Sequence, residues 1–105
     1  MQTELKETLL ENMVTNLLVL RTKLRLKQIE VANMIGVTRQ TYMAIETGKR
    51  PLPWSTFLAL VLIFSKNKET NMMLTMFDIY TDELNEYIKS GKLESDTKET
   101  DNGKS

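Results

Sequence analysis

The residues whose side chains could do chemistry are concentrated between Gln28 and Arg50. Hydroxyl, amide and cationic groups recur there at short spacing, and these are the groups that contact nucleic-acid bases and phosphates. Arg and Gln can each make two hydrogen bonds to the edge of one base, whereas Lys, Arg and Thr contact phosphate oxygens. The side chains of this kind in the second half of the stretch belong to Thr38, Arg39, Gln40, Thr41, Thr47, Lys49 and Arg50.

Catalytic and metal chemistry is restricted by what the chain lacks. The 105 residues contain no Cys and no His, which removes thiolates, disulfides, and the commonest general base and metal ligand. One acidic group remains at helical spacing, and it consists of Asp78, Asp82, Glu83 and Glu86. Without a second acidic cluster we interpret it as a solvated helix face. We therefore predict no enzymatic activity, no metal site and no cofactor.

Two short helices must position the polar residues. Residues 28–35 have a helical pattern of apolar positions, and the inward ones are Val31, Ala32 and Ile35. Gly36 permits the positive φ of a tight turn, and Thr38 is a good N-cap for a second helix from about Arg39 to Thr47. A helix pair of this kind can place its second helix in the DNA major groove.

The helix predicted from Arg39 to Thr47 has two faces, because successive residues differ by about 100° around its axis. Its inward half contains Thr41, Tyr42, Ile45 and Glu46. Its outward half contains Arg39, Gln40, Met43, Ala44 and Thr47. Met43 fits a place in the groove and a plain surface position equally well. A ligand would meet the outward half.

An earlier helix is predicted from about residue 13 to 25, and its pattern can be extended upstream through Leu5 and Leu9. Its apolar positions are Met13, Leu17, Leu20 and Leu24. Arg21 falls on this apolar face, where a charge without a partner is very costly. Glu46 lies at the edge of the inward half of its own helix. We therefore predict an Arg21–Glu46 ion pair that links the two helices.

The chain continues with more helical segments. Pro51 and Pro53 prevent helical continuation, and the run from Trp54 to Phe64 is apolar almost all round, which predicts a central, covered helix. After a polar break at residues 65–68, the stretch from Asn71 to about Lys89 predicts one or two amphipathic helices. Their apolar positions are Met72, Met73, Met76, Phe77, Tyr80, Leu84, Tyr87 and Ile88.

These segments predict an all-α fold with one main domain. We divide the chain into an N-terminal helical extension (1–12), a helix-turn-helix domain (13–68), a C-terminal amphipathic helical segment (69–89) and a disordered polar tail (90–105). The longest apolar run, residues 57–64, is much shorter than the roughly 20 residues that a membrane helix needs. Residues 1–12 contain three Glu and lack the apolar core of a signal peptide. We therefore expect a cytoplasmic protein with no membrane partner.

The charges are distributed unevenly although the formal net charge is zero. Residues 21–50 contain seven basic and two acidic side chains, whereas residues 69–105 contain nine acidic and four basic ones. This asymmetry indicates a cationic face that suits phosphates and an acidic segment that avoids DNA.

One ordered set of sequence pieces runs through the basic part of the chain: Arg21, Leu26-Lys27-Gln28, Val31-Ala32, Ile35-Gly36-Val37-Thr38-Arg39-Gln40-Thr41 and Ile45-Glu46-Thr47-Gly48-Lys49-Arg50. At these spacings the set resembles the helix-turn-helix domain of phage Cro/C1-type regulators, the xenobiotic-response-element (XRE) family. The resemblance extends from Arg21 to Phe64, somewhat under half of the chain. It implies a compact five-helix, lambda-repressor-like domain, here with an extra C-terminal helical segment.

The resemblance also implies roles for single residues. The base-reading positions of the family match Arg39, Gln40 and Ala44. Its phosphate-contacting positions match Gln28, Thr38, Thr41, Thr47, Lys49 and Arg50. Arg39 would bind guanine or phosphate, Gln40 adenine or guanine, and Ala44 a thymine methyl group. Thr47 stands where the family more often has Asn, which weakens the expectation for this contact.

A second departure concerns the helix from Trp54 to Phe64. Ala59 and Leu62 occupy positions that are more often charged in the family, and we expect another element to cover them. The C-terminal helices and a second protomer are equally good candidates. A dimer would hold two recognition helices about 34 Å apart, so that both could read a palindrome.

The leading hypothesis is therefore a sequence-specific, DNA-binding transcriptional regulator, a repressor that binds double-stranded DNA as a homodimer. The alternative is a protein-interaction module, such as an antitoxin or a co-regulator, that binds a partner protein through its C-terminal helices. The Met-rich residues 71–89 and the acidic C-terminal segment would form that surface.

Overall fold

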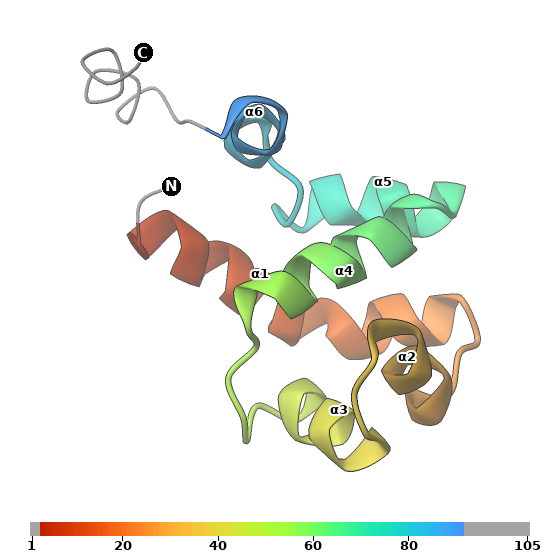
Figure 1. The fold of residues 1–105 in the computed structure, drawn as a ribbon. Helices are drawn as coiled ribbons and strands as arrows, with labels where there is room; N and C mark the ends of the chain where they lie inside the picture. The colour runs from red at the N-terminus through yellow and green to blue at the C-terminus, as the bar shows by residue number, and fades with distance from the viewer. Residues whose placement is uncertain (1–2, 92–105) are drawn as a thin grey trace.

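The computed structural model describes residues 3–91, and this part of the chain is all-helical, without a strand (Figure 1). The helices are α1 (Thr3–Lys23), α2 (Gln28–Ile35), α3 (Arg39–Glu46), α4 (Trp54–Ser65), α5 (Lys68–Met76) and α6 (Asp82–Ser90). The prediction of an all-α fold is thus confirmed. The tail predicted for residues 90–105 lies, from residue 92 onward, outside the described residues.

Helix α1 is longer at its N-terminal end than the minimal prediction and shorter at its C-terminal end. It is continuous from Thr3, because buried apolar side chains recur every three or four residues from Leu9 to Leu20. It ends at Lys23 rather than at residue 25. Arg25 has a positive φ of 58°, and the backbone N–H groups of Leu24 and Leu26 both donate to the Arg21 carbonyl, which turns the chain away.

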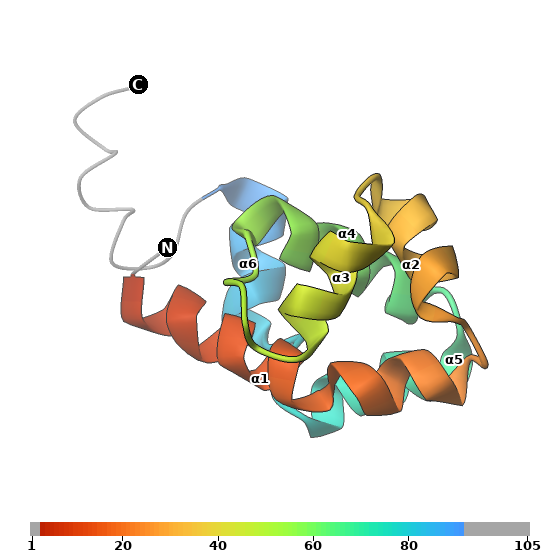
Figure 2. The same ribbon diagram turned by 90° about the horizontal axis from the view of Figure 1, so that it is seen from below.

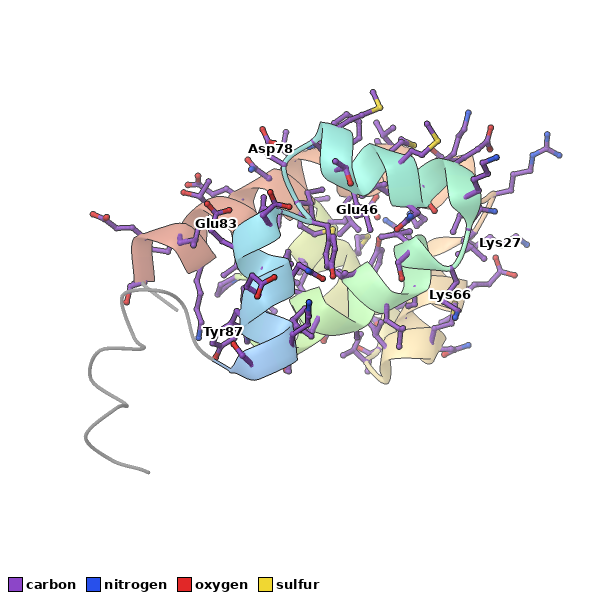
Figure 3. All side chains as sticks on the ribbon, turned by 90° about the horizontal axis from the view of Figure 1, so that it is seen from above. Lys27, Glu46, Lys66, Asp78, Glu83 and Tyr87 are labelled. Atoms are coloured by element: carbon purple, nitrogen blue, oxygen red, sulfur yellow. The ribbon has the colours of Figure 1, made fainter. Side chains whose placement is uncertain are left out.

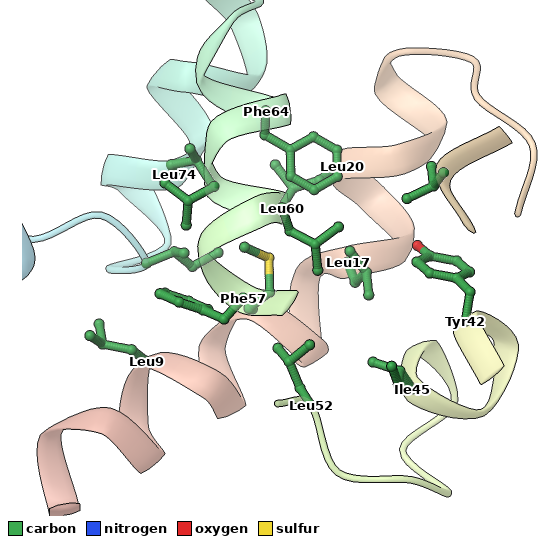
Figure 4. Close-up of a cluster of buried hydrophobic side chains, with 14 of the residues drawn as sticks. Leu9, Leu17, Leu20, Tyr42, Ile45, Leu52, Phe57, Leu60, Phe64 and Leu74 are labelled. Atoms are coloured by element: carbon green, nitrogen blue, oxygen red, sulfur yellow. The ribbon is translucent and has the colours of Figure 1, made fainter. Parts of the chain in front are cut away.

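The hydrophobic core is built around α4, which packs against α1, α2 and α5. Phe57, Leu60 and Phe64 project from α4 into the core and are completely buried (Figure 4). Helix α1 contributes Leu17 and Leu20 from the opposite side. This arrangement makes α4 the central element, as its apolar sequence predicts.

One side of α4 is not covered by another helix of the described residues, so of the two candidates for covering Ala59 and Leu62 the C-terminal helices do not cover Leu62. The Leu62 side chain is 62% exposed, although Ala59 is half-buried. Helix α6 lies above α4 in Figure 1 without covering Leu62. The two helices leave an apolar groove of about 420 Å³, which Leu62 lines together with Tyr80 and Ile88.

The stretch from Asn71 to Lys89 forms parts of two helices. Helix α5 begins at Lys68, earlier than predicted, because the Asn67 side chain accepts a hydrogen bond from the Glu69 N–H and caps the helix. Thr81 caps α6 in the same way. Two methionines among the predicted apolar positions are exposed, because the buried face of α5 is formed by Thr70 and Leu74. These methionines are Met72 and Met76, which are 57% and 70% exposed.

Candidate nucleic-acid interface

Helices α2 and α3 form a tight pair, and α3 lies on the side of the molecule that is seen in Figure 2. Gly36 ends α2 with a φ of 79°, a conformation that suits glycine. Thr38 then caps α3, because its Oγ1 accepts a hydrogen bond from the Thr41 N–H at 3.1 Å. The turn between the helices thus has the positive φ at Gly36 and the N-cap at Thr38 that the sequence predicts.

The two faces of α3 have different environments. Tyr42 and Ile45 are buried and anchor the helix to the core. Arg39 and Gln40 are exposed on the other face, and neither side chain makes a hydrogen bond or ion pair with any residue in the described range 3–91. Their side chains are therefore available to a ligand. Met43 is exposed and Ala44 is half-buried on the same face.

The turn after α3 carries the remaining polar residues. The helix ends at Glu46, and Thr47, predicted as its last residue, is the C-cap. The Thr47 hydroxyl donates to the Met43 carbonyl at 2.9 Å, so its proton is already engaged within the chain. The Thr47 hydroxyl must break this bond before it can donate to a phosphate. Lys49 is exposed, and Arg50 donates to Thr41 Oγ1 at 3.1 Å.

Arg21 and Glu46 form a two-pronged ion pair beneath this surface. Arg21 Nε lies 2.8 Å from Glu46 Oε1, and Arg21 Nη2 lies 2.9 Å from Oε2. Arg21 Nη1 also donates to the Leu26 carbonyl at 2.8 Å. The two side chains are only 12% and 6% exposed. The pair therefore ties α3 to α1 and to the loop before α2.

The ion pair changes the proton affinity of both partners. The hydrogen bond to Glu46 raises the pKa of Arg21. Burial is the largest single influence and acts to raise the pKa of Glu46, but the hydrogen bonds and the charge of Arg21, together with the neighbouring Tyr42 and Gln28 side chains, outweigh it, so the pKa of Glu46 lies below its ordinary value. Both residues are thus held in their charged forms.

Two further side chains lie beside this pair, and only Tyr42 shares the predicted inward half of α3 with Glu46. Tyr42 lies beside Glu46, and burial raises the pKa of its hydroxyl above the ordinary value. The Gln28 side chain is half-buried and also lowers the pKa of Glu46. Gln28 was predicted to contact phosphate, and in the structure its side chain is directed toward the ion pair. A helical wheel of α3 alone could not reveal this neighbour.

An acidic side chain also lies at the start of α2. The Glu30 carboxylate accepts a hydrogen bond from the Lys27 N–H at 2.7 Å. This contact stabilises the first turn of α2, since a carboxylate there compensates an unpaired amide. It also places a negative charge next to the position where the phosphate contact of Gln28 is expected.

The charged regions of the sequence remain separate in the fold. Helix α3 and helix α6 lie on opposite sides of α4 (Figure 1). Arg39, Lys49 and Arg50 belong to the first side, and α6 carries acidic residues in its first turn. This separation keeps most acidic side chains of residues 69–91 away from α3.

The acidic residues considered as a carboxylate site do not form one. Asp78 lies in the turn between α5 and α6 with a φ of 56°, whereas Glu83 lies on α6 (Figure 3). The predicted single helix face is therefore wrong, because Thr81 starts a new helix after Asp78. No group of three or more acidic side chains that could hold a metal ion occurs among residues 3–91. In the same range, no helix combines the length and the apolar character that crossing a bilayer requires.

Comparison with known proteins agrees with this geometry. Residues 17–61 match the model of a family described as helix-turn-helix. The match begins within α1 and ends within α4, so it contains the helix pair and both partners of the Arg21–Glu46 ion pair. The chain has no significant match to a curated protein or to a solved structure. Residues 17–61 are a helix-turn-helix domain of the Cro/C1-type (XRE) family, the lambda-repressor-like helical domain of DNA-binding transcription regulators.

Proposed function

We propose that this protein is a sequence-specific repressor that binds double-stranded DNA and reads the major groove with α3. One observation carries the proposal. The Arg39 and Gln40 side chains are exposed and make no hydrogen bond or ion pair with residues 3–91, on a helix whose opposite face is fixed by Tyr42 and Ile45. A rigid helix with uncommitted hydrogen-bonding groups is what base recognition requires.

Base reading is assigned to three residues of α3. Gln40 pairs with adenine or guanine, and Arg39 donates to guanine or to a flanking phosphate. Ala44 offers only an apolar contact, which suits a thymine methyl group. Met43 borders this set with its exposed side chain, and its share in the contact depends on how deeply α3 enters the groove.

Phosphate contacts surround the base-reading residues. Lys49 and Arg50 follow α3, Thr38 and Thr41 stand at its start, and Gln28 opens α2. We rank Thr47 last in this group, because its hydroxyl already donates to Met43. Contacts of this kind supply most of the affinity and make it depend strongly on salt.

We assign the protein to a homodimer that represses transcription in the cytoplasm, without catalytic activity. A dimer supplies two copies of α3, which can read a palindromic operator. The exposed Leu62 and the apolar groove beside it support a covering partner, and a second copy of this chain is the occupant that such an operator requires. Occupying an operator is sufficient for repression, whereas activation needs a further contact surface.

A protein-interaction module is the second candidate function. The same apolar groove between α4 and α6 supports it, together with the exposed Met72 and Met76 on α5. Methionine side chains adapt to different partners and are common on binding surfaces. In this case α3 would not select any DNA sequence.

The first test is binding-site selection from a random duplex pool, followed by a salt titration with the selected duplex. A palindromic winner with a steep salt dependence supports a dimeric repressor. Binding without an enriched sequence contradicts base reading by α3 and favours the protein-interaction module.

Single substitutions then separate base reading from phosphate contact. Gln40→Ala should change the preference at one base pair by about 1–3 kcal/mol. Lys49→Ala should weaken binding to all sequences alike and reduce the salt slope by about one. Lys89→Ala is the matched control, because it removes an exposed lysine from α6, on the opposite side of α4. A Gln40→Ala variant with unaltered preference would remove Gln40 from the base-reading set.

A further inference from the structure

Arg50 is held in place by the first turn of α3. Its Nη1 donates to Thr41 Oγ1 at 3.1 Å, across nine residues of sequence. Thr41 Oγ1 also accepts a hydrogen bond from the Thr38 hydroxyl at 3.0 Å. Thr38 Oγ1 in turn accepts from the Thr41 N–H. A continuous chain of hydrogen bonds therefore joins the helix cap to the guanidinium group.

The other basic side chains of this surface are not restrained in this way. The Arg39 and Lys49 side chains make no hydrogen bond or ion pair with another residue of the described part of the chain. Arg50 uses one donor on Thr41, and a guanidinium has five. Its side chain is exposed, so the remaining donors can bind a ligand while the bond to Thr41 stays intact.

Restraining a long cationic side chain before binding has a physical consequence. An unrestrained arginine loses rotamer freedom when it docks on a phosphate, and this loss opposes binding. A bond to Thr41 removes part of the loss in advance. It also orients the planar guanidinium, whose two-pronged contact with phosphate depends on direction.

We propose that Thr41 is a positioning residue for Arg50, which it holds beside the start of α3 as a preorganised phosphate anchor. The inference rests on the proposed DNA-binding function and refines it. Thr41 then contributes to affinity through Arg50, and this role takes the place of the direct phosphate contact proposed for Thr41. The bond affects all operator sequences alike, because the group that it orients meets the backbone and not a base edge.

A double-mutant cycle on the selected operator tests the proposal. Thr41→Val keeps the shape of the side chain and removes the hydroxyl, and we expect it to weaken binding roughly threefold to tenfold. In the Arg50→Ala background the same change should have less than about a twofold effect, since the group to be positioned is gone. Thr41→Ser restores the hydroxyl and should bind like the wild type. Thermal unfolding of each variant verifies that it is folded.

Two binding outcomes overturn the inference. An equal effect of Thr41→Val with and without Arg50 would mean that Thr41 contacts DNA directly. A normal affinity of Thr41→Val, while Arg50→Ala binds weakly, would mean that Arg50 needs no positioning. If the wild type selects no duplex, the proposed function fails before the cycle begins, and the two failures are thus distinguishable.

Side-chain NMR relaxation tests the positioning without DNA. In the free wild-type protein, the Arg50 Nε–H group should be more ordered than that of Arg39, and Thr41→Val should abolish the difference. Equal mobility of the two arginines in the wild type would overturn the proposal whatever the binding data show.

Discussion

The Arg21 guanidinium extends from α1 to the end of α3 and donates hydrogen bonds to both carboxylate oxygens of Glu46. The distances are 2.8 Å from Nε to Oε1 and 2.9 Å from Nη2 to Oε2. These residues are 25 positions apart in the sequence, and both side chains are nearly buried. The orientation of α3, the helix that carries Arg39 and Gln40, therefore depends on a charge in α1. A defect in this pair should affect both folding and DNA recognition.

Arg21→Met should lower the free energy of unfolding by about 3–5 kcal/mol, because it leaves the Glu46 carboxylate buried without its partner. Lys23→Met is the matched control on the same helix. Lys23 Nζ lies 3.9 Å from Glu69 Oε2, and both side chains are largely exposed. Loss of this ion pair should therefore lower the free energy of unfolding by less than about 1 kcal/mol. Urea unfolding followed by circular dichroism measures both values. Equal destabilisation by the two changes would contradict the structural role of the pair.

Replacing both partners at once should be less harmful than replacing one. Arg21→Met combined with Glu46→Leu removes both charges and leaves apolar side chains of similar size, so that no unpaired charge stays buried. We expect the double variant to be more stable than Arg21→Met alone. A double variant that loses the sum of the two single effects would argue against their coupling.

The free energy of unfolding should decrease as the pH becomes acidic, because Glu46 becomes protonated. The pKa of Glu46 is lowered in the folded state, so the folded protein binds fewer protons here than the unfolded chain does. The stabilising contribution is complete above the pKa of the unfolded state and is lost as the pH falls through the folded-state pKa. Unfolding at a series of pH values measures the slope. Glu46→Gln should flatten the slope in this range, and an unchanged slope would assign the acid sensitivity to other carboxylates.

The first half of α1 should stabilise the domain, although the family match begins only at residue 17. Leu9 is buried in the core and Leu18, on the same helix, is 52% exposed. Leu9→Ala should cost about 2–5 kcal/mol, whereas Leu18→Ala should change stability by less than about 0.5 kcal/mol. Lys6 Nζ lies 5.0 Å from the centre of the Trp54 ring, so the fluorescence of this single Trp reports on the packing of α1. Similar losses for both variants would show that Leu9 is not part of the core.

The turn between α2 and α3 should depend on glycine. Gly36 has a φ of 79°, and a Cβ at this position would meet no atom within 4 Å, so the cost of a side chain comes from the backbone alone. Gly36→Ala should destabilise the protein by about 1–2 kcal/mol. Gly36→Asn should cost less, because Asn tolerates this conformation better. Thermal unfolding of the two variants gives the comparison, and an equal loss would indicate a steric cause instead.

Local features of the helix pair could be predicted from the sequence, because their causes lie within a few residues. Gly36 turns the chain, Thr38 caps α3, and the helical period separates Tyr42 and Ile45 from Arg39 and Gln40. The partner of Arg21 could also be inferred, since a charge on an apolar face requires an opposite charge on a neighbouring face.

Contacts between residues that are far apart in the sequence could be identified only from the tertiary structure. Gln28 is directed toward the ion pair, and Arg50 turns back onto Thr41. Neither follows from periodicity, because a rotamer depends on neighbours that the fold brings near. The exposure of Leu62 has the same origin, since it depends on where α6 comes to rest.

The sequence by itself thus determined the all-helical fold, the division of α3 into a buried and an exposed face, and the Arg21–Glu46 pair. Hydrophobic period, capping and charge balance act locally and can be read along the chain. Only the tertiary structure decided which polar groups are already engaged, as for Thr47 and Arg50, and which remain available, as for Arg39 and Gln40. Whether a hydrogen bond forms depends on differences of a few tenths of an ångström in the donor–acceptor distance, and the packing of the folded chain sets that distance.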